Sequence, residues 1–225
     1  MPLVDRRNTL EHTDGVSKDK LCLIIVWSLS ALVATLAFIA WGNDLSWQFG
    51  HLNTYLFFPL LGLLAFSVMW SHYVAGTLRE LMDVDQTRLT NYYRYTGYAV
   101  LTLICLHPGL LIYQLFRDGA GLPPLSYERY VAPGLGWITL LGTASLLIFL
   151  AFEFRRIYAK HSWWHFVPEA GDFAMLAIFY HGLRLGSQLR HAGWFVTVWW
   201  FYGITLTVII ARSYAKKYAN KKARR

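Results

Sequence analysis

Six long apolar blocks constrain the fold of this 225-residue chain more than any other feature of its sequence. A helix needs about 20 mostly apolar residues to cross a hydrocarbon core of roughly 30 Å, and each block is close to that length. The fold class that follows is all-α: a polytopic membrane protein built as a six-helix bundle. The blocks predict membrane-crossing helices at residues 21–41, 54–75, 94–116, 133–154, 168–186 and 194–212.

The composition agrees with a chain surrounded by lipid. Hydrophobic residues make up 56% of the chain and charged residues 15%, whereas about 25% of residues are charged in ordinary globular domains. The loops between the blocks are too short to fold alone, so we expect one transmembrane domain at residues 21–212. It is preceded by a polar N-terminal segment, 1–20, and followed by a basic tail, 213–225.

The basic residues predict the orientation of the bundle. With six crossings both termini lie on one side, which receives 17 of the 21 Lys and Arg residues; the other side receives only Arg117, Arg129, Arg184 and Arg190. The positive-inside rule therefore places both termini in the cytoplasm. We expect the tail to lie against anionic lipid, with partner docking as the alternative. This distribution explains the net charge of +8 without any nucleic-acid partner.

Two histidines within the crossings are candidates for chemistry, since ionisable side chains are costly inside a bilayer. His107 follows Arg94 by 13 residues, and His181 follows Pro168 by 13 residues. At about 1.5 Å per residue both lie roughly 20 Å from the cytoplasmic boundary. The third and fifth helices run in the same direction, so the two imidazoles share one depth in the outer half of the membrane.

Paired imidazoles at one depth are what bis-histidine ligation of a haem iron requires, with one neutral ring nitrogen on each face of the porphyrin. The alternatives are hydrogen bonding between helices and the binding of another metal. Glycines on the same two helices are expected to give a flat ring room, namely Gly97, Gly109, Gly171, Gly182 and Gly186.

The same residues carry a family resemblance. Arg94-x-x-Gly97 followed by His107, with Trp164 ahead of the fifth helix and His181 within it, resembles the ferric reductase-like transmembrane domain family. Within that family the chain is most similar to the haem-binding membrane subunit of the bacterial methionine sulfoxide reductase system. The resemblance implies a b-type cytochrome core in the bacterial inner membrane that passes electrons across the bilayer.

The resemblance also implies which residues hold the cofactor. Many members carry two histidines on each ligand helix and bind two haems, but here the inner positions are Arg94 and Pro168. One haem b held by His107 and His181 is therefore expected. Two haems are the alternative, with His72 and His165 as replacement inner ligands. Arg94 is expected to contact a haem propionate or a lipid phosphate.

No Gly-rich dinucleotide fingerprint occurs, and we expect no flavin or nicotinamide domain and no catalytic residue in this chain. Electrons would then come from a separate flavin reductase or a membrane quinol and pass to an acceptor protein or small molecule on the outer face. The chain would be the electron-transfer component of an oxidoreductase. The rival hypothesis is a non-redox transporter, or an assembly or interaction subunit; a transporter would show broken helices or a buried charge near the midplane.

Overall fold

The computed structural model describes residues 6–153, 160, 161, 164, 166–191 and 193–223, and this part of the chain contains helices and no strand. The expected all-α class is confirmed. In chain order the helices are α1 (Arg6–Asp44), α2 (Thr54–Leu81), η1 (Gln86–Leu89), α3 (Thr90–Arg117), α4 (Leu125–Tyr130), α5 (Gly136–Glu153), α7 (Val167–Leu185), α8 (Ser187–His191) and α9 (Gly193–Ala223).

Five of these helices, α1, α2, α3, α5 and α9, are long and apolar enough to cross a membrane. The chain is thus a multi-pass helical membrane protein, as predicted. The sixth expected crossing, residues 168–186, coincides with α7, which is not among the five. That helix has 19 residues and carries Glu169, Asp172 and Arg184, and these charges lower its mean hydropathy. A crossing by α7 stays a prediction.

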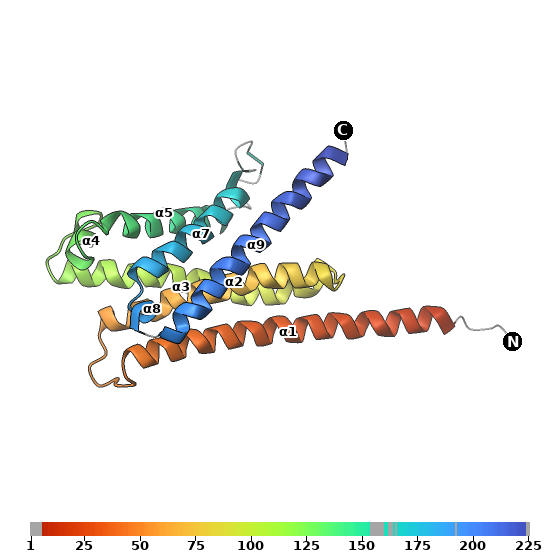
Figure 1. Ribbon diagram of the computed structural model, residues 1–225, viewed down its shortest axis with the longest axis horizontal. Helices are drawn as coiled ribbons and strands as arrows, with labels where there is room; N and C mark the ends of the chain where they lie inside the picture. Colours follow the sequence, from red (N-terminus) through yellow and green to blue (C-terminus); the bar gives the residue numbers. More distant parts are fainter. Residues whose placement is uncertain (1–5, 154–159, 162–163, 165, 192, 224–225) are drawn as a thin grey trace.

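The long helices run side by side, with the beginning of α1 and the end of α9 at the same end of the bundle (Figure 1). We call this the basic end, because it carries Lys18, Arg79 and the last turns of α9. Helix α7 reaches both ends. At the basic end Lys217 Nζ on α9 lies 2.6 Å from Glu169 Oε1. At the opposite end Ser187 Oγ, just beyond α7, donates to Asp44 Oδ2 at 3.0 Å. Helix α7 therefore extends over the length of the bundle.

Two boundaries differ from those expected. Helix α1 begins at Arg6, within the polar segment 1–20, and α9 continues to Ala223, within the basic tail 213–225. Neither segment contains a proline after Pro2, and Lys and Arg are good helix formers. The polar flanks therefore extend the apolar helices as continuous helix beyond the expected crossings.

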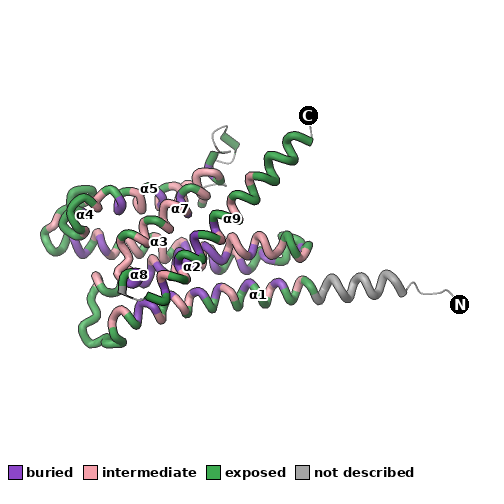
Figure 2. The backbone as a smooth tube through the Cα atoms, viewed as in Figure 1, coloured by how far each residue is buried: buried purple, intermediate pink, exposed green. Residues whose placement is uncertain are grey.

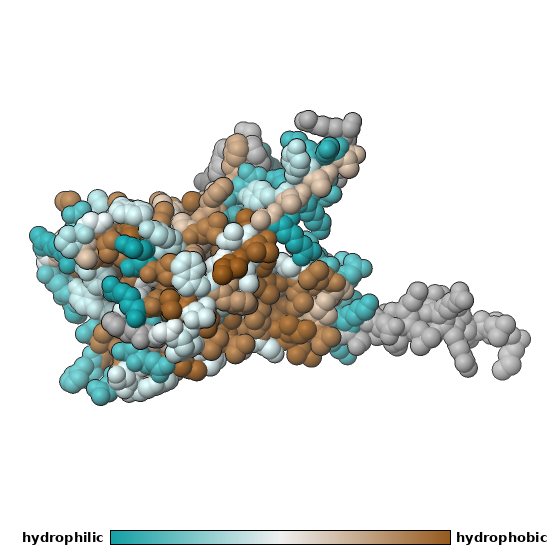
Figure 3. Space-filling model, viewed as in Figure 1, coloured by the Kyte–Doolittle hydropathy of each residue, from teal (hydrophilic) through white to brown (hydrophobic). Residues whose placement is uncertain are grey.

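Helix α2 is the most buried of the long helices (Figure 2), and aromatic side chains pack it against α9. The ring centroids of Phe66 and Trp199 are 4.4 Å apart, as are those of Trp70 and Tyr202. Trp70 Nε1 also donates to Thr205 Oγ1 at 2.8 Å. These contacts join α2 to α9, and the surface around them is a belt of hydrophobic residues with hydrophilic residues gathered toward the ends (Figure 3).

Buried hydroxyls join the first three long helices near the basic end. Ser30 Oγ on α1 lies 2.8 Å from Ser71 Oγ on α2 and 2.8 Å from the Tyr92 hydroxyl on α3. Hydrogen bonds between polar side chains can hold helices together in a membrane, where neighbouring lipid is as apolar as the helix surface. Helix α3, which carries His107, is fixed against α2 in this way.

Candidate functional site

His107 on α3 packs against α2, where its ring is hydrogen-bonded to a backbone carbonyl and lies over a glycine. Its Nδ1 lies 2.8 Å from the carbonyl oxygen of Phe58. The ring lies over Gly62, where an added Cβ would lie 2.7 Å from Cε1 of the imidazole. The Phe58 ring packs on the imidazole with a centroid distance of 5.1 Å. The position therefore has space for the histidine only because residue 62 is glycine.

His181 on α7 is held against α5 by the same arrangement. Its Nδ1 lies 2.8 Å from the carbonyl oxygen of Ile138. A Cβ added to Gly142 would lie 2.7 Å from Cε1 of the ring. In both cases the glycine follows the accepting residue by four positions, which is about one helical turn. Two separate helix pairs thus seat an imidazole in the same way.

These hydrogen bonds determine the protonation of each ring. A carbonyl oxygen can only accept, so Nδ1 of His107 and Nδ1 of His181 each carry the proton. In the neutral ring the other nitrogen, Nε2, then keeps its lone pair, and neither Nε2 is hydrogen-bonded to the described part of the chain. A backbone carbonyl bonded to one ring nitrogen is the usual support of a histidine that ligates a metal through the other.

Both histidines line one cavity of about 390 Å³, which we call the histidine cavity. Its volume falls within the range of roughly 300–1,000 Å³ that is usual for small-molecule sites. Apolar and aromatic side chains form most of the wall, including Phe66, Leu111, Leu135, Leu146, Ile178 and Trp199.

The histidine cavity has a basic margin at the opposite end of the bundle. Arg184, one turn after His181 on α7, and Arg190 on α8 both line it and are exposed. Neither forms an ion pair with a carboxylate in the described part of the chain. The amide of Gln188, which is buried in the same wall, donates to Asp44 Oδ2 at 2.9 Å. The two guanidinium groups are therefore available to an anionic ligand.

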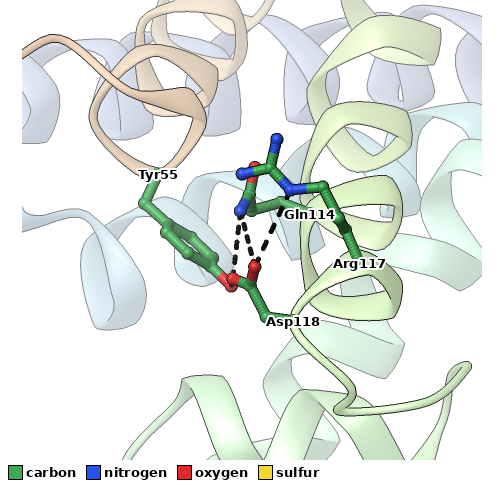
Figure 4. Close-up of polar contacts among 4 residues, drawn as sticks. All are labelled: Tyr55, Gln114, Arg117 and Asp118. Carbon is green, nitrogen blue, oxygen red and sulfur yellow. Dashed lines mark hydrogen bonds and ion pairs between the residues drawn. The ribbon is translucent and has the colours of Figure 1, made fainter.

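A polar cluster lies at the end of α3, outside the lining of the histidine cavity (Figure 4). The Tyr55 hydroxyl donates to Asp118 Oδ2 at 2.6 Å, and the Gln114 amide donates to both carboxylate oxygens at 2.9 and 3.0 Å. These bonds lower the pKa of Asp118, and the bond from Tyr55 contributes most. The Tyr55 ring stacks on Tyr130 of α4, which lines the histidine cavity. The cluster thus fixes α2, α3 and α4 around the site.

The remaining candidates lie away from the two histidines. Arg94 is exposed, donates to the Tyr95 hydroxyl at 3.1 Å and does not line the histidine cavity. His72 lines a second cavity of about 820 Å³, which we call the basic-end cavity, and its Nε2 lies 2.7 Å from Thr96 Oγ1. His165 lies outside the described residues.

Of the glycines expected to give a ring room, Gly182 and Gly186 line the histidine cavity, whereas Gly97 and Gly171 line the basic-end cavity. Gly109 lines neither. The glycines that contact the imidazoles are Gly62 on α2 and Gly142 on α5. Neither glycine lies on a helix that carries one of the two histidines. No spacing in the sequence identifies them. Arg184 could have been found, because it follows His181 by one helical turn.

Comparison with protein-family models, curated proteins and solved structures found no match to this chain. Among the described residues no group of three or more His, Cys, Asp and Glu side chains gathers as a metal site would. The fold and the site together define a multi-pass helical membrane protein with a paired-histidine cavity. A two-histidine site suits a metal whose other ligands come from a macrocycle.

Proposed function

We propose that the chain is a haem-binding electron-transfer subunit in which His107 and His181 are the axial ligands of one haem b. The observation that carries this proposal is the pair of imidazoles lining one cavity, each with Nδ1 bonded to a carbonyl and Nε2 left with a lone pair. Hydrogen bonding between helices explains one nitrogen of each ring. It gives no reason for the two histidines to line a common cavity.

The proposal includes six membrane crossings with both termini in the cytoplasm. Helix α7 supports the sixth crossing, because Glu169 in its first turn pairs with Lys217 at the basic end and Ser187, just beyond its last residue, bonds to Asp44 at the opposite end. Its charged residues lie near its ends, at Glu169, Asp172 and Arg184, where they can reach the interface. The excess of Lys and Arg at the basic end supports a cytoplasmic location for that end.

The arginines of the histidine cavity support one orientation of the cofactor. The propionates of a haem are carboxylates, and guanidinium groups bind carboxylates well. We assign this role to Arg184 and Arg190, which line the cavity, in place of Arg94, which does not. The propionate edge would then face the opposite, outer end of the bundle.

A bound haem supplies a reversible one-electron iron couple. His107 and His181 would set its potential through their bonds to Phe58 and Ile138, since a hydrogen-bonded imidazole is a stronger ligand. The lining residues Met69, Ile104 and Phe149 are common to both cavities, so the histidine cavity is adjacent to the basic-end cavity. This adjacency favours entry of electrons from the cytoplasmic side and exit at the outer face.

The donor would be a separate flavin reductase or a membrane quinol, and the acceptor a protein or small molecule on the outer face. The resemblance to the ferric reductase-like family favours this assignment and a bacterial inner membrane. We propose one haem rather than two, because His72 is the only histidine among the described residues that lines the basic-end cavity.

The test is haem reduction and reoxidation in proteoliposomes. Addition of a reduced quinol analogue, or of a flavin reductase with its reductant, should produce the reduced haem absorption band. Ferricyanide, which does not cross the bilayer, should then reoxidise the haem from the outer face. His107→Ala should abolish both signals and His72→Ala should preserve them. A haem that is bound but is reduced by no donor would refute the electron-transfer role and favour a non-redox assembly subunit.

A further inference from the structure

The basic-end cavity has an apolar floor that continues toward the histidine cavity. It lies between α2, α3, α7 and α9 and has a volume of about 820 Å³. Met69, Ile104 and Phe149 form the part of its wall that it shares with the histidine cavity. Hydrophilic residues border the hollow between α9 and the end of α2 (Figure 3). The cavity thus presents a polar margin and an apolar interior.

The margin carries an excess of positive charge where α2 meets α9. Lys216 Nζ lies 3.1 Å from Glu80 Oε2, and Arg79 on α2 and Arg212 on α9 line the same cavity. These two helices therefore bring more cations than anions to the margin, while Glu153 and Asp172 line the cavity from α5 and α7. Arg79 has one long hydrogen bond, 3.4 Å to the Val84 carbonyl, and no described residue accepts a hydrogen bond from Arg212. The two guanidinium groups can bind a further anion.

The other polar side chains in this wall are largely satisfied within the protein. The Tyr73 hydroxyl donates to Asp172 Oδ1 at 2.9 Å, and the Tyr214 hydroxyl donates to Asp172 Oδ2 at 3.2 Å. His72 is bonded to Thr96. Glu153 also lines the cavity, but it lies on α5, whereas the arginines lie on α2 and α9. The arginine pair is thus the part of the margin that lacks a strong partner.

We propose that the basic-end cavity binds one anionic phospholipid, with its phosphate between Arg79 and Arg212 and an acyl chain over the apolar floor. The arginines lie near the ends of α2 and of the predicted crossing 194–212, where lipid headgroups are located. A neutral quinone would offer no negative charge to the guanidinium pair. A second haem would need two imidazoles, and the described wall offers only His72. This inference does not depend on haem binding in the other cavity.

The experiment is native mass spectrometry of the full chain in detergent, titrated with phosphatidylglycerol or with phosphatidylcholine of the same acyl chains. We expect phosphatidylglycerol to bind about tenfold more tightly, because charge-assisted bonds to arginine add to chain burial. The double variant R79Q/R212Q should lose this preference. The matched control K221Q/K222Q removes the same charge from α9 residues that do not line the cavity, and it should keep the preference.

A second variant tests the cavity without changing its charge. Gly171 lines the wall, and nothing lies within 4 Å of a Cβ added there. Gly171→Leu should therefore fold and lower phosphatidylglycerol binding by filling the space. Equal binding of both lipids, or equal loss in K221Q/K222Q, would overturn the proposal in favour of diffuse surface attraction. Displacement of the lipid by inorganic phosphate alone, or by a quinone analogue, would overturn it as well.

Discussion

The carbonyl oxygen of Phe58 lies 2.8 Å from Nδ1 of His107, and this single contact fixes which nitrogen of the ring is protonated. His181 is related to Ile138 in the same way on the other side of the cavity. Each accepting residue is followed one turn later by a glycine under the ring. Repetition of the arrangement on two unrelated helix pairs is the structural basis for treating the histidines as one site.

Gly62→Ala should displace the His107 ring from its position on α2. A Cβ at residue 62 would lie 2.7 Å from His107 Cε1, so the ring must move away from α2. Overpacking of this kind costs about 1–3 kcal/mol, which predicts haem binding weaker by about 5- to 150-fold. Haem titration of the purified chain measures the effect. Gly109→Ala is the control, since nothing lies within 4 Å of a Cβ there. Equal haem affinities in the two variants would contradict the role of Gly62 beneath the His107 ring.

Thr205→Val should destabilise the bundle without touching the site. Trp70 is 3% exposed, and the variant leaves its Nε1 without the hydroxyl that accepts its proton. An unsatisfied buried donor costs about 1–3 kcal/mol. We expect a lower Tm in detergent. Thr207→Val is the matched control, because the Thr207 hydroxyl bonds only to the Gly203 carbonyl of its own helix; a Tm loss as large in this control would argue against the role of Trp70.

Acid should weaken the cluster around Asp118. The pKa of Asp118 is lowered in the folded protein, chiefly by the Tyr55 hydrogen bond, so folding favours the deprotonated carboxylate. The resulting stability is present above the unfolded pKa of about 3.9 and is lost as pH falls through the lower folded pKa. Tm measured from about pH 5 down to about pH 2 should decline less steeply in Tyr55→Phe than in the wild type.

Tyr113→Phe is the control for this acid dependence, because Tyr113 lies on the same helix as Gln114 and is 60% exposed. It should keep the decline of the wild type. A parallel loss of stability in Tyr55→Phe and Tyr113→Phe as the pH falls would contradict the role of Tyr55 in lowering the pKa of Asp118.

Labelling of single cysteines should establish the crossing by α7. In a chain with Cys22→Ala and Cys105→Ala, we would place a cysteine at Lys160, before α7, or at Gly193, after it. Both residues are exposed, and Gly193 has open space for a side chain. A membrane-impermeant maleimide applied to intact cells should label Gly193→Cys and not Lys160→Cys. Labelling of both positions, or of neither, would argue against a crossing by α7.

The sequence predicts the helices better than it predicts the site. Long apolar blocks identify five of the crossings, because lipid requires backbone hydrogen bonds to close within each helix. Helix α7 is ambiguous, since its charges lie at the ends of a short apolar stretch. Equal offsets along two helices indicate that His107 and His181 share a depth. No local pattern indicates that Gly62 and Gly142 lie beneath them, because that depends on how distant helices pack.

Arg94 is expected to contact a haem propionate or a lipid phosphate. Its side chain lies against Tyr95, with the guanidinium carbon 4.9 Å from the ring centroid, and it does not line the histidine cavity. The contact with a lipid phosphate stays a prediction. Replacing Arg184 and Arg190, which line the histidine cavity, should affect the bound haem more than replacing Arg94. We expect R184Q/R190Q to shift the haem midpoint potential and Arg94→Gln to leave it unchanged, as measured by redox titration. Arg129→Gln controls for loss of charge at the end of the bundle opposite the basic end, because Arg129 does not line that cavity.

The most direct test of the central claim is the haem content of the purified chain and of its histidine variants. Absorption spectra of the oxidised and reduced protein, with a pyridine haemochrome assay, should give a low-spin b-type spectrum with about one haem per chain. His107→Ala and His181→Ala should each abolish this spectrum, while His72→Ala should retain it. A colourless wild-type protein after expression with ample haem, or a full unshifted spectrum in either ligand variant, would contradict the account.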